Sequence, residues 1–243
     1  MEFRSLLKDF AASFLDLIYP PLCLHCDETL ESGCKIFCRS CLEMMEMIDP
    51  LTRCSLCFSS DLDREKENKC QGCRKNPRNI SHIASVFDYE GPAATLVKQL
   101  KYGGQSYLAK GGGAYLAAQF LTLGWPIPDF ILPMPMAPLR RWERGYNQSM
   151  LLAQTFSQLI QCPVSTLLKR KNGDFSQAGL DYQQRLSLQS DSFFLKKGED
   201  FFDRNLLLID DVMTTGSSLN CCAEALTPFF PKSIYALTLC RTL

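Results

Sequence analysis

From residue 81 onward, segments with helical spacing of apolar residues alternate with short, continuous apolar runs. The runs predict strands at 83–89, 130–133, 206–209 and 234–239. The periodic segments predict helices at 93–101, 107–122, 149–160 and 219–226. The run at 206–209 is apolar at every position, which is typical of a strand buried on both faces. The alternation predicts an α/β domain over residues 81–243, in which helices flank a parallel sheet.

Residues 1–19 have the pattern of an amphipathic helix. Their apolar side chains recur at spacings of three and four, which places them on one helical face: Phe3, Leu6, Leu7, Phe10, Phe14, Leu17 and Ile18. Pro20 and Pro21 end this helix. In one interpretation the helix packs on the protein's own body, and in the other it binds a membrane surface or a partner.

Two acidic residues, Asp9 and Asp16, interrupt this segment, so it lacks the apolar stretch of a secretory signal. The sequence also has no run of about 18 apolar residues, so we expect no transmembrane segment. The protein is therefore expected to be cytoplasmic. In a reducing compartment, clustered cysteines favour metal binding over disulfides.

Residues 20–80 show little periodic apolar patterning, but they contain nine of the thirteen cysteines. Eight of these form four Cys-x2-Cys pairs: Cys23 and Cys26, Cys38 and Cys41, Cys54 and Cys57, and Cys70 and Cys73. One such pair directs two thiolates at an ion, and two pairs complete a tetrahedron. The spacing therefore predicts a double zinc ribbon with two structural Zn2+ sites. Sequential pairing is the simplest arrangement, although the spacing also allows an interleaved one.

The ribbons have two interpretations: they brace the neighbouring domain, or they recognise a partner or a nucleic acid. Residues 1–80 carry 11 basic and 13 acidic side chains, which argues against a phosphate-binding surface there. The whole chain balances 26 basic residues against 26 acidic ones, which excludes a strongly basic nucleic-acid binder.

The candidate ligand site follows the apolar run at 206–209. Two adjacent acids, Asp210 and Asp211, come at the carboxyl end of this strand, and a loop of small residues leads into the next helix. The loop consists of Thr214, Thr215, Gly216, Ser217 and Ser218. Its N–H groups and hydroxyls form an anion site at a helix N-terminus. The acids repel phosphate, but they can accept hydrogen bonds from ribose hydroxyls or hold a metal ion. A sugar carrying a 5′-phosphate satisfies both halves of the pattern.

This stretch resembles the phosphoribosyl-diphosphate motif of type I phosphoribosyltransferases. The resemblance implies that Asp210 and Asp211 contact the ribose 2′- and 3′-hydroxyls, and that the loop at 214–218 binds the 5′-phosphate. It also implies phosphoribosyl diphosphate as the ligand, bound together with Mg2+.

Further motifs resemble those of the bacterial ComF (competence protein F) family. They are Pro133-Met-Pro135, Arg140 and Arg141, Arg144-Gly-Tyr-Asn147-Gln148, Gln177-Ala-Gly-Leu180 and Arg185. With the cysteine pairs, the resemblance covers nearly the whole chain, from residue 20 to 243. It implies a type I phosphoribosyltransferase-like domain behind a double zinc ribbon, and a role in DNA uptake during natural transformation.

Residues 140–148 are expected to form a basic, polar loop. The residues considered for contact with a diphosphate or a nucleic acid are Arg140, Arg141, Arg144, Asn147, Gln148 and Arg185. The arginines either clamp a diphosphate or follow a nucleic-acid backbone, with Trp142 and Tyr146 as stacking surfaces. A solvated basic face is the third interpretation. Lys101 precedes a glycine loop, where it either reaches the diphosphate or caps its helix.

Two functions remain open from the sequence. The first is a phosphoribosyltransferase, in which Asp210 and Asp211 hold the ribose while Lys101 and Arg144 offset the charge of the leaving diphosphate. The second is a non-catalytic module of the competence machinery. It would bind single-stranded DNA or a partner such as a DNA-translocating helicase.

Overall fold

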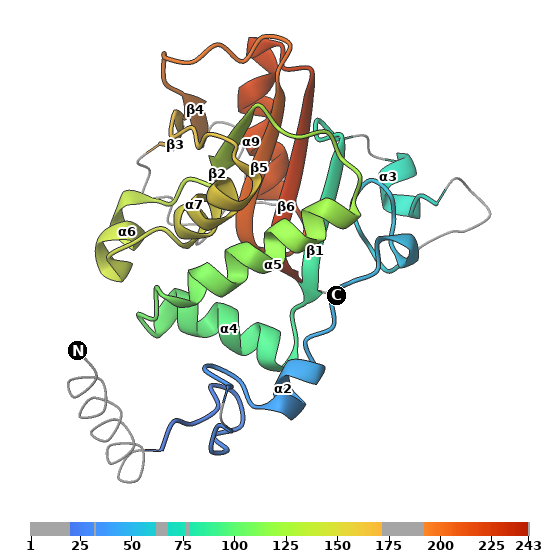
Figure 1. Cartoon of the computed structure of the whole chain (residues 1–243). Helices are drawn as coiled ribbons and strands as arrows, with labels where there is room; N and C mark the ends of the chain where they lie inside the picture. The colour runs from blue at the N-terminus through green and yellow to red at the C-terminus, as the bar shows by residue number, and fades with distance from the viewer. Residues whose placement is uncertain (1–19, 32, 62–67, 76–77, 172–191, 243) are drawn as a thin grey trace, which may run out of the picture.

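The computed structural model describes residues 20–31, 33–61, 68–75, 78–171 and 192–242. Its centre is a four-stranded parallel sheet in the order β1-β6-β5-β2 (Figure 1). The strands are β1 (His82–Asp88), β2 (Phe130–Pro133), β5 (Asn205–Met213) and β6 (Ser233–Arg241). The prediction of a parallel sheet is therefore confirmed. The helix expected at 1–19, the motif at 177–180 and Arg185 lie outside the described residues.

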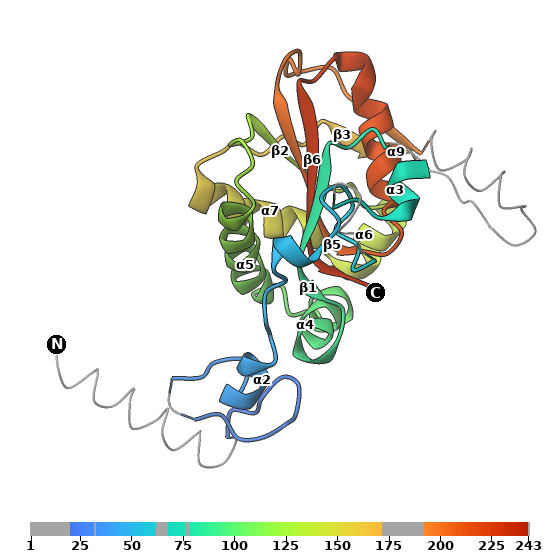
Figure 2. The same ribbon diagram turned by 90° about the vertical axis from the view of Figure 1, so that its right-hand side faces the viewer.

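Helices cover both faces of this sheet. On one face lie α5 (Leu108–Thr122) and α7 (Gln148–Ile160), and on the other lies α9 (Ser217–Leu226) (Figure 2). Successive residues of β5 alternate between the two cores: Leu207 and Ile209 pack on the α5–α7 side, and Leu206 and Leu208 on the α9 side. All four are fully buried. This double coverage explains why the strand is apolar at every position.

Shorter elements complete the described structure. They are α2 (Arg39–Glu43), α3 (Gln71–Lys75), α4 (Gly91–Tyr102), α6 (Pro138–Arg144), the 3-10 turns η1 (Pro50–Thr52) and η2 (Thr227–Phe229), and the strands β3 (Leu168–Arg170) and β4 (Phe193–Leu195). The antiparallel pair β3–β4 was not expected from the sequence; Leu168 and Phe193 of this pair pack into the α9 core. No helix in the described ranges is long and apolar enough to cross a membrane.

The basic segment at 140–148 begins as a helix, so the prediction of a loop is wrong for residues 140–144. Pro138 lies in the first turn of α6, and Gly145 ends the helix with a left-handed φ of 79°. Proline at the start and glycine just past the end are common signals of a helix, and both are visible in the sequence. Asn147 then caps α7, because its side chain accepts a hydrogen bond from the N–H of Ser149.

Two glycines allow α5 and α7 to approach each other closely. A Cβ on Gly113 would lie 2.5 Å from Thr155 Cβ and 3.0 Å from the backbone oxygen of Leu152. A Cβ on Gly112 would lie 2.7 Å from Cδ2 of Leu152, at the flexible end of that side chain. By contrast, a Cβ on Gly111 would meet no atom within 4 Å.

These contacts predict a graded series of alanine variants. Gly113→Ala should lower the free energy of unfolding by about 1–3 kcal/mol, because α5 and α7 must move apart. Gly112→Ala should cost less, since a leucine side chain can rotate away. The control Gly111→Ala should be neutral or stabilise by up to about 1 kcal/mol, because alanine is the better helix former. Urea unfolding measures all three, and equal effects at the three positions would contradict the packing described.

Candidate metal centres and ligand site

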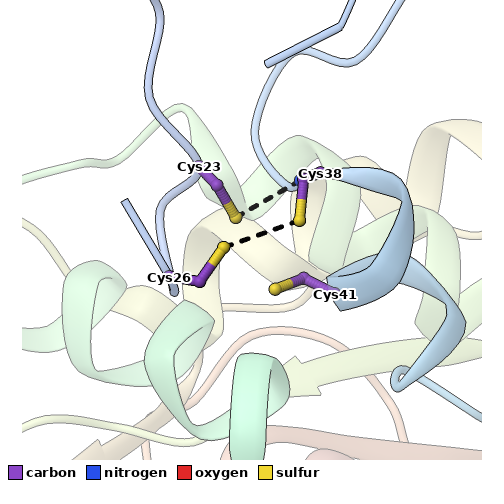
Figure 3. A group of neighbouring side chains, drawn as sticks. All are labelled: Cys23, Cys26, Cys38 and Cys41. Atoms are coloured by element: carbon purple, nitrogen blue, oxygen red, sulfur yellow. Dashed lines mark hydrogen bonds between the residues drawn. The ribbon is translucent and has the colours of Figure 1, made fainter. Parts of the chain in front are cut away.

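Eight cysteines gather in two groups of four. The first cluster is Cys23, Cys26, Cys38 and Cys41, and the second cluster is Cys54, Cys57, Cys70 and Cys73. In each cluster the Sγ atoms lie within 4.8 Å of one another, and Figure 3 shows those of the first cluster pointing toward one another. The sequential pairing of the Cys-x2-Cys pairs is thus confirmed, and the interleaved alternative is wrong.

The sulfur positions fit a tetrahedral metal ion. Four thiolates about 2.3 Å from a zinc ion lie about 3.8 Å from one another. The Sγ atoms of Cys26 and Cys38 are 3.6 Å apart, and those of Cys57 and Cys70 are 3.5 Å apart. Each cluster can therefore hold one metal ion through four sulfur ligands.

Backbone amides favour the thiolate form of one cysteine in each cluster. The N–H of Cys38 donates to Cys23 Sγ at 3.2 Å, and the N–H of Cys70 donates to Cys54 Sγ at 3.3 Å. Burial opposes ionisation of these thiols, but the amide hydrogen bonds outweigh it. They lower the pKa of Cys23 to about 6 and that of Cys54 to about 7. Because metals bind the thiolate, this donor set fits the expected structural metal.

The second cluster is docked on the edge of the sheet. The edge strand β1 donates from Ile83 N–H to the backbone oxygen of Leu56, which lies inside the third cysteine pair, at 2.9 Å. The same strand accepts a hydrogen bond at Val86 O from Ile48 N–H, at 2.8 Å. An exposed strand edge is free to pair with another chain, so these contacts also protect β1.

Two largely buried arginines join the second cluster to the carboxyl ends of β1 and β6. Arg241, the last residue of β6, is 9% exposed and donates from Nη1 to the backbone oxygen of Cys57 at 2.7 Å. Arg53 forms an ion pair with Asp88, the last residue of β1. Removing one member of such a pair leaves a buried charge uncompensated, which is costly. These contacts support the interpretation that the ribbons brace the α/β domain.

The first cluster lies against α4, and Figure 1 shows α2 next to the start of that helix. His25, inside the first cysteine pair, is not a cluster ligand; its Nδ1 lies 2.8 Å from Thr95 Oγ1 of α4. The buried residues Cys23 and Phe37 belong to the same apolar core as Leu96 of α4. Both clusters therefore contact the α/β domain.

The two acids lie near the carboxyl end of β5, as the sequence predicts. Asp211 is 6% exposed, and its Oδ1 lies 2.9 Å from Nζ of Lys101, in the last turn of α4. Asp210 Oδ1 accepts hydrogen bonds from Ser149 Oγ at 2.8 Å and from Asp211 N–H at 2.9 Å. Ser149 was not predicted as a site residue, because a serine at the start of a helix is too common to indicate a site.

Asp210 is hard to ionise in the folded protein. Burial and the carboxylate of Asp211 raise the pKa of Asp210 to about 7, although the Ser149 hydroxyl, the Asp211 N–H and Lys101 oppose this shift. An acid whose pKa is raised by burial and a specific charged neighbour is characteristic of ligand and active sites.

The small-residue loop leads into α9. Gly216 is the N-cap of this 10-residue helix with φ 76°, a conformation that glycine adopts without strain. The N–H of Ser217 donates to Thr215 Oγ1 at 3.3 Å, and the two hydroxyl oxygens are 2.8 Å apart. Thr214, Thr215 and Ser218 are exposed, so a ligand can reach them. The first turn of a helix offers backbone N–H groups to an anion.

A cavity of about 500 Å³ lies between the end of α4 and α6. It is lined by Lys101, Tyr102, Gly104, Arg140, Glu143, Arg144 and Tyr146. Three of these are cations that the sequence analysis singled out for a diphosphate. The guanidinium of Arg144 lies 4.9 Å from the centre of the Tyr102 ring, which fixes its position. Lys101 lines the cavity and also forms the ion pair with Asp211, so the cavity lies next to the acid pair.

The remaining residues of the basic segment lie outside the cavity lining. Arg141 is exposed on α6. Asn147 Nδ2 donates to the backbone oxygen of Met134 at 3.0 Å, and its Oδ1 caps α7. Gln148 is 1% exposed, and its Nε2 has no hydrogen-bond partner among the described residues. The structure thus places Asn147 and Gln148 at the start of α7.

Fold and site together define an α/β protein with two four-cysteine clusters and an acid pair beside a cationic cavity. Competence protein F of Haemophilus influenzae is 29% identical to the chain over 204 residues, covering 82% of the chain and 87% of that protein. DNA utilization protein YhgH of Escherichia coli (strain K12) is 29% identical over 233 residues, covering 93% and 100%. Competence protein ComFC of Streptococcus pneumoniae is 25% identical over 225 residues, covering 90% and 87%. The chain is thus a homologue of competence protein F and ComFC proteins, which confirms the resemblance.

No protein-family model matches the chain. Solved structures that resemble it include a purine phosphoribosyltransferase from Pyrococcus horikoshii, with 16% identity and a TM-score of 0.36, covering 54% of this chain and 71% of that one. A hypoxanthine-guanine phosphoribosyltransferase from Bacillus anthracis has 13% identity and a TM-score of 0.37, covering 56% and 70%. Structural likeness of this size supports no inference about the site.

The environment of Asp210 predicts a pH-dependent effect of Asp210→Asn. The folded carboxyl keeps its proton up to a pKa of about 7, whereas the unfolded one ionises near 3.8. The stability gained by holding this proton is therefore fully present at low pH and is lost as the pH rises through about 7. Asparagine cannot ionise, so at pH 8 the variant without ligand should melt at least about 2 °C above wild type. At pH 5 the difference should shrink.

Thermal unfolding at the two pH values checks this expectation. Glu199→Gln, at an exposed carboxyl, serves as the control and should change the melting temperature little at either pH. An Asp210→Asn variant that loses the same stability at both pH values would contradict the description of this site.

Proposed function

We propose that this protein binds phosphoribosyl diphosphate or a closely related sugar phosphate. The observation that carries the proposal is the order of groups along β5, where the acid pair near the carboxyl end is followed by the hydroxyl-rich loop that opens α9. These groups match a ribose 5-phosphate. The acid pair supplies acceptors for the ribose hydroxyls, and the loop supplies donors for the phosphate. The cationic cavity beside Asp211 meets the remaining need, a site for the diphosphate.

In this proposal each part of the site binds one part of the ligand. Asp210 and Asp211 accept hydrogen bonds from the ribose hydroxyls, and the loop at 214–218 donates to the 5′-phosphate. The cations that line the cavity, Lys101, Arg140 and Arg144, hold the diphosphate. Two carboxylates beside a diphosphate site fit Mg2+, which proteins bind through one or two carboxylates and substrate phosphates. When bound, Mg2+ would offset part of the negative charge of the diphosphate.

As a transferase, the site would break the bond between the anomeric carbon of the ribose and the diphosphate oxygen. The electron pair would leave on the diphosphate, while an acceptor supplies the pair for the new bond to that carbon. Lys101 and Arg144 would stabilise the negative charge that develops on the leaving group. The ion pair between Lys101 and Asp211 would keep this cation in position beside the ribose.

We also propose that both cysteine clusters bind Zn2+. Four sulfur ligands leave no open coordination position, so these ions would be structural. Residues 20–80 then form a double zinc ribbon, and residues 81–243 form the ligand-binding domain. The names of the relatives refer to competence and DNA utilization, which supports a role in DNA uptake during natural transformation. Such a role would be cytoplasmic, with a DNA-translocating helicase as partner.

Exposed aromatic rings favour single-stranded DNA binding as a second candidate function. Trp142 on α6 is 83% exposed, and Tyr102 at the end of α4 is 76% exposed. Rings of this kind stack on unpaired bases while neighbouring arginines follow the backbone. Arg141, on the exposed surface of α6, supplies such a charge.

Calorimetric titration with phosphoribosyl diphosphate and Mg2+ tests the first candidate. We expect wild type to bind with micromolar affinity. At pH 8, where Asp210 is ionised, the variants Asp210→Asn and Asp211→Asn should bind at least about tenfold more weakly, because each replaces a carboxylate acceptor with a neutral group. Glu199→Gln, at the exposed position used above, is the matched control and should bind as wild type does.

The contrary outcome distinguishes the two candidates. Folded wild type that does not bind phosphoribosyl diphosphate would overturn the first. If the same protein bound single-stranded DNA with an affinity that falls steeply with salt, the second would take its place.

A further inference from the structure

A residue of the cysteine region lies directly over the small-residue loop. A Cβ placed on Gly216 would come 2.7 Å from Nη1 of Arg78. Arg78 follows Cys73, the last ligand of the second cluster, by five residues and precedes β1. Its side chain is exposed, and no hydrogen bond or ion pair of its guanidinium occurs within the described ranges. The donors of this guanidinium are therefore available to a ligand at the loop.

The chain on the carboxyl side of Arg78 is fastened to the elements that form the site. The N–H of Asn79 donates to Oδ1 of Asn220, which lies in the first half of α9, at 3.1 Å. The N–H of Ser81 donates to the backbone oxygen of Ile234 in β6 at 2.7 Å. These bonds hold the segment beside the start of α9, which is the helix that the loop opens.

Two other arginines lie near Arg78. Arg53 and Arg78 are both close enough to Arg241 for their charges to interact with it, as are the opposite charges of Cys57 and Asp88. Asp88 neutralises Arg53 through their ion pair. Arg78 has no such partner among the described residues, so its charge is available to an anionic ligand.

We propose that Arg78 is a phosphate-binding residue that the cysteine region contributes to the ligand site. Its guanidinium donates hydrogen bonds to the 5′-phosphate held by the loop at 214–218. This inference rests on the proposed function and adds that both parts of the chain complete the site. It also revises the expectation from net charge, because one well-placed arginine gives the mildly acidic region a phosphate contact.

The test compares three ligands by calorimetry: ribose 5-phosphate, phosphoribosyl diphosphate and inorganic diphosphate. Arg78→Gln should weaken binding of the first two by about tenfold, the loss expected for one exposed charged hydrogen bond. It should leave binding of inorganic diphosphate unchanged, because that ligand has no 5′-phosphate. Arg78→Lys, which keeps the charge, should recover part of the affinity.

Lys75→Gln is the matched control, because it removes one positive charge from an exposed position of α3 in the same region. It should bind all three ligands as wild type does. Thermal unfolding of Arg78→Gln should match wild type, since its exposed side chain forms no hydrogen bond or ion pair with the described residues. A binding loss with unchanged melting is then a direct effect on the site.

Two outcomes would overturn the inference, and they differ from each other. If wild type binds ribose 5-phosphate and Arg78→Gln binds it equally well, or loses inorganic diphosphate to the same degree, Arg78 is not a 5′-phosphate contact and the proposed function stands. If folded wild type binds neither sugar phosphate, the proposed function fails together with the inference.

Discussion

The structure depends on the attachment of the second cysteine cluster to the edge of the parallel sheet. In the described part of the second cluster, the buried apolar residues are its four cysteines, so contacts with the neighbouring domain and the metal proposed above would supply its stability. At the carboxyl ends of the strands, Arg241 reaches the backbone of Cys57 and Arg53 pairs with Asp88. Breaking any of these contacts would leave a charge buried without its partner. The cluster and the sheet therefore hold each other in one arrangement.

This attachment also determines what surrounds the ligand site. In an open α/β sheet, ligands bind at the carboxyl ends of the strands. Here Met213, at the end of β5, pairs in register with Arg241 of β6, which pairs in turn with Asp88 of β1. The small-residue loop begins immediately after Met213, and Arg241, which contacts the second cluster at Cys57, is the neighbour of Met213 in the sheet. The hydrogen bonds of Asn79 and Ser81 to α9 and β6 hold the following segment in place, and Arg78 lies beside Gly216.

Local patterns were enough to predict the features that depend on neighbours in sequence. Three features depend on only a few consecutive residues each: the strand core at 206–209, the four Cys-x2-Cys pairs and the acid pair before the loop. The contacts of Lys101 with Asp211 and of Ser149 with Asp210 are different, because they depend on how α4 and α7 pack on the sheet. No short pattern marks such contacts. Helix α6 is an intermediate case, since its proline and glycine signals were present but the density of arginines suggested a loop.

Hydrogen exchange at the edge strand tests the central claim, that the second cysteine cluster, with its proposed metal, holds the sheet edge and thereby shapes the site. The Ile83 amide donates to Leu56, within the second cluster, whereas the Leu208 amide lies in the interior strand β5. In protein containing two metal ions per chain, both amides should be protected. After chelation, exchange at Ile83 should accelerate by at least about tenfold while Leu208 stays protected. Unchanged protection of Ile83 after complete removal of the metal would contradict this account.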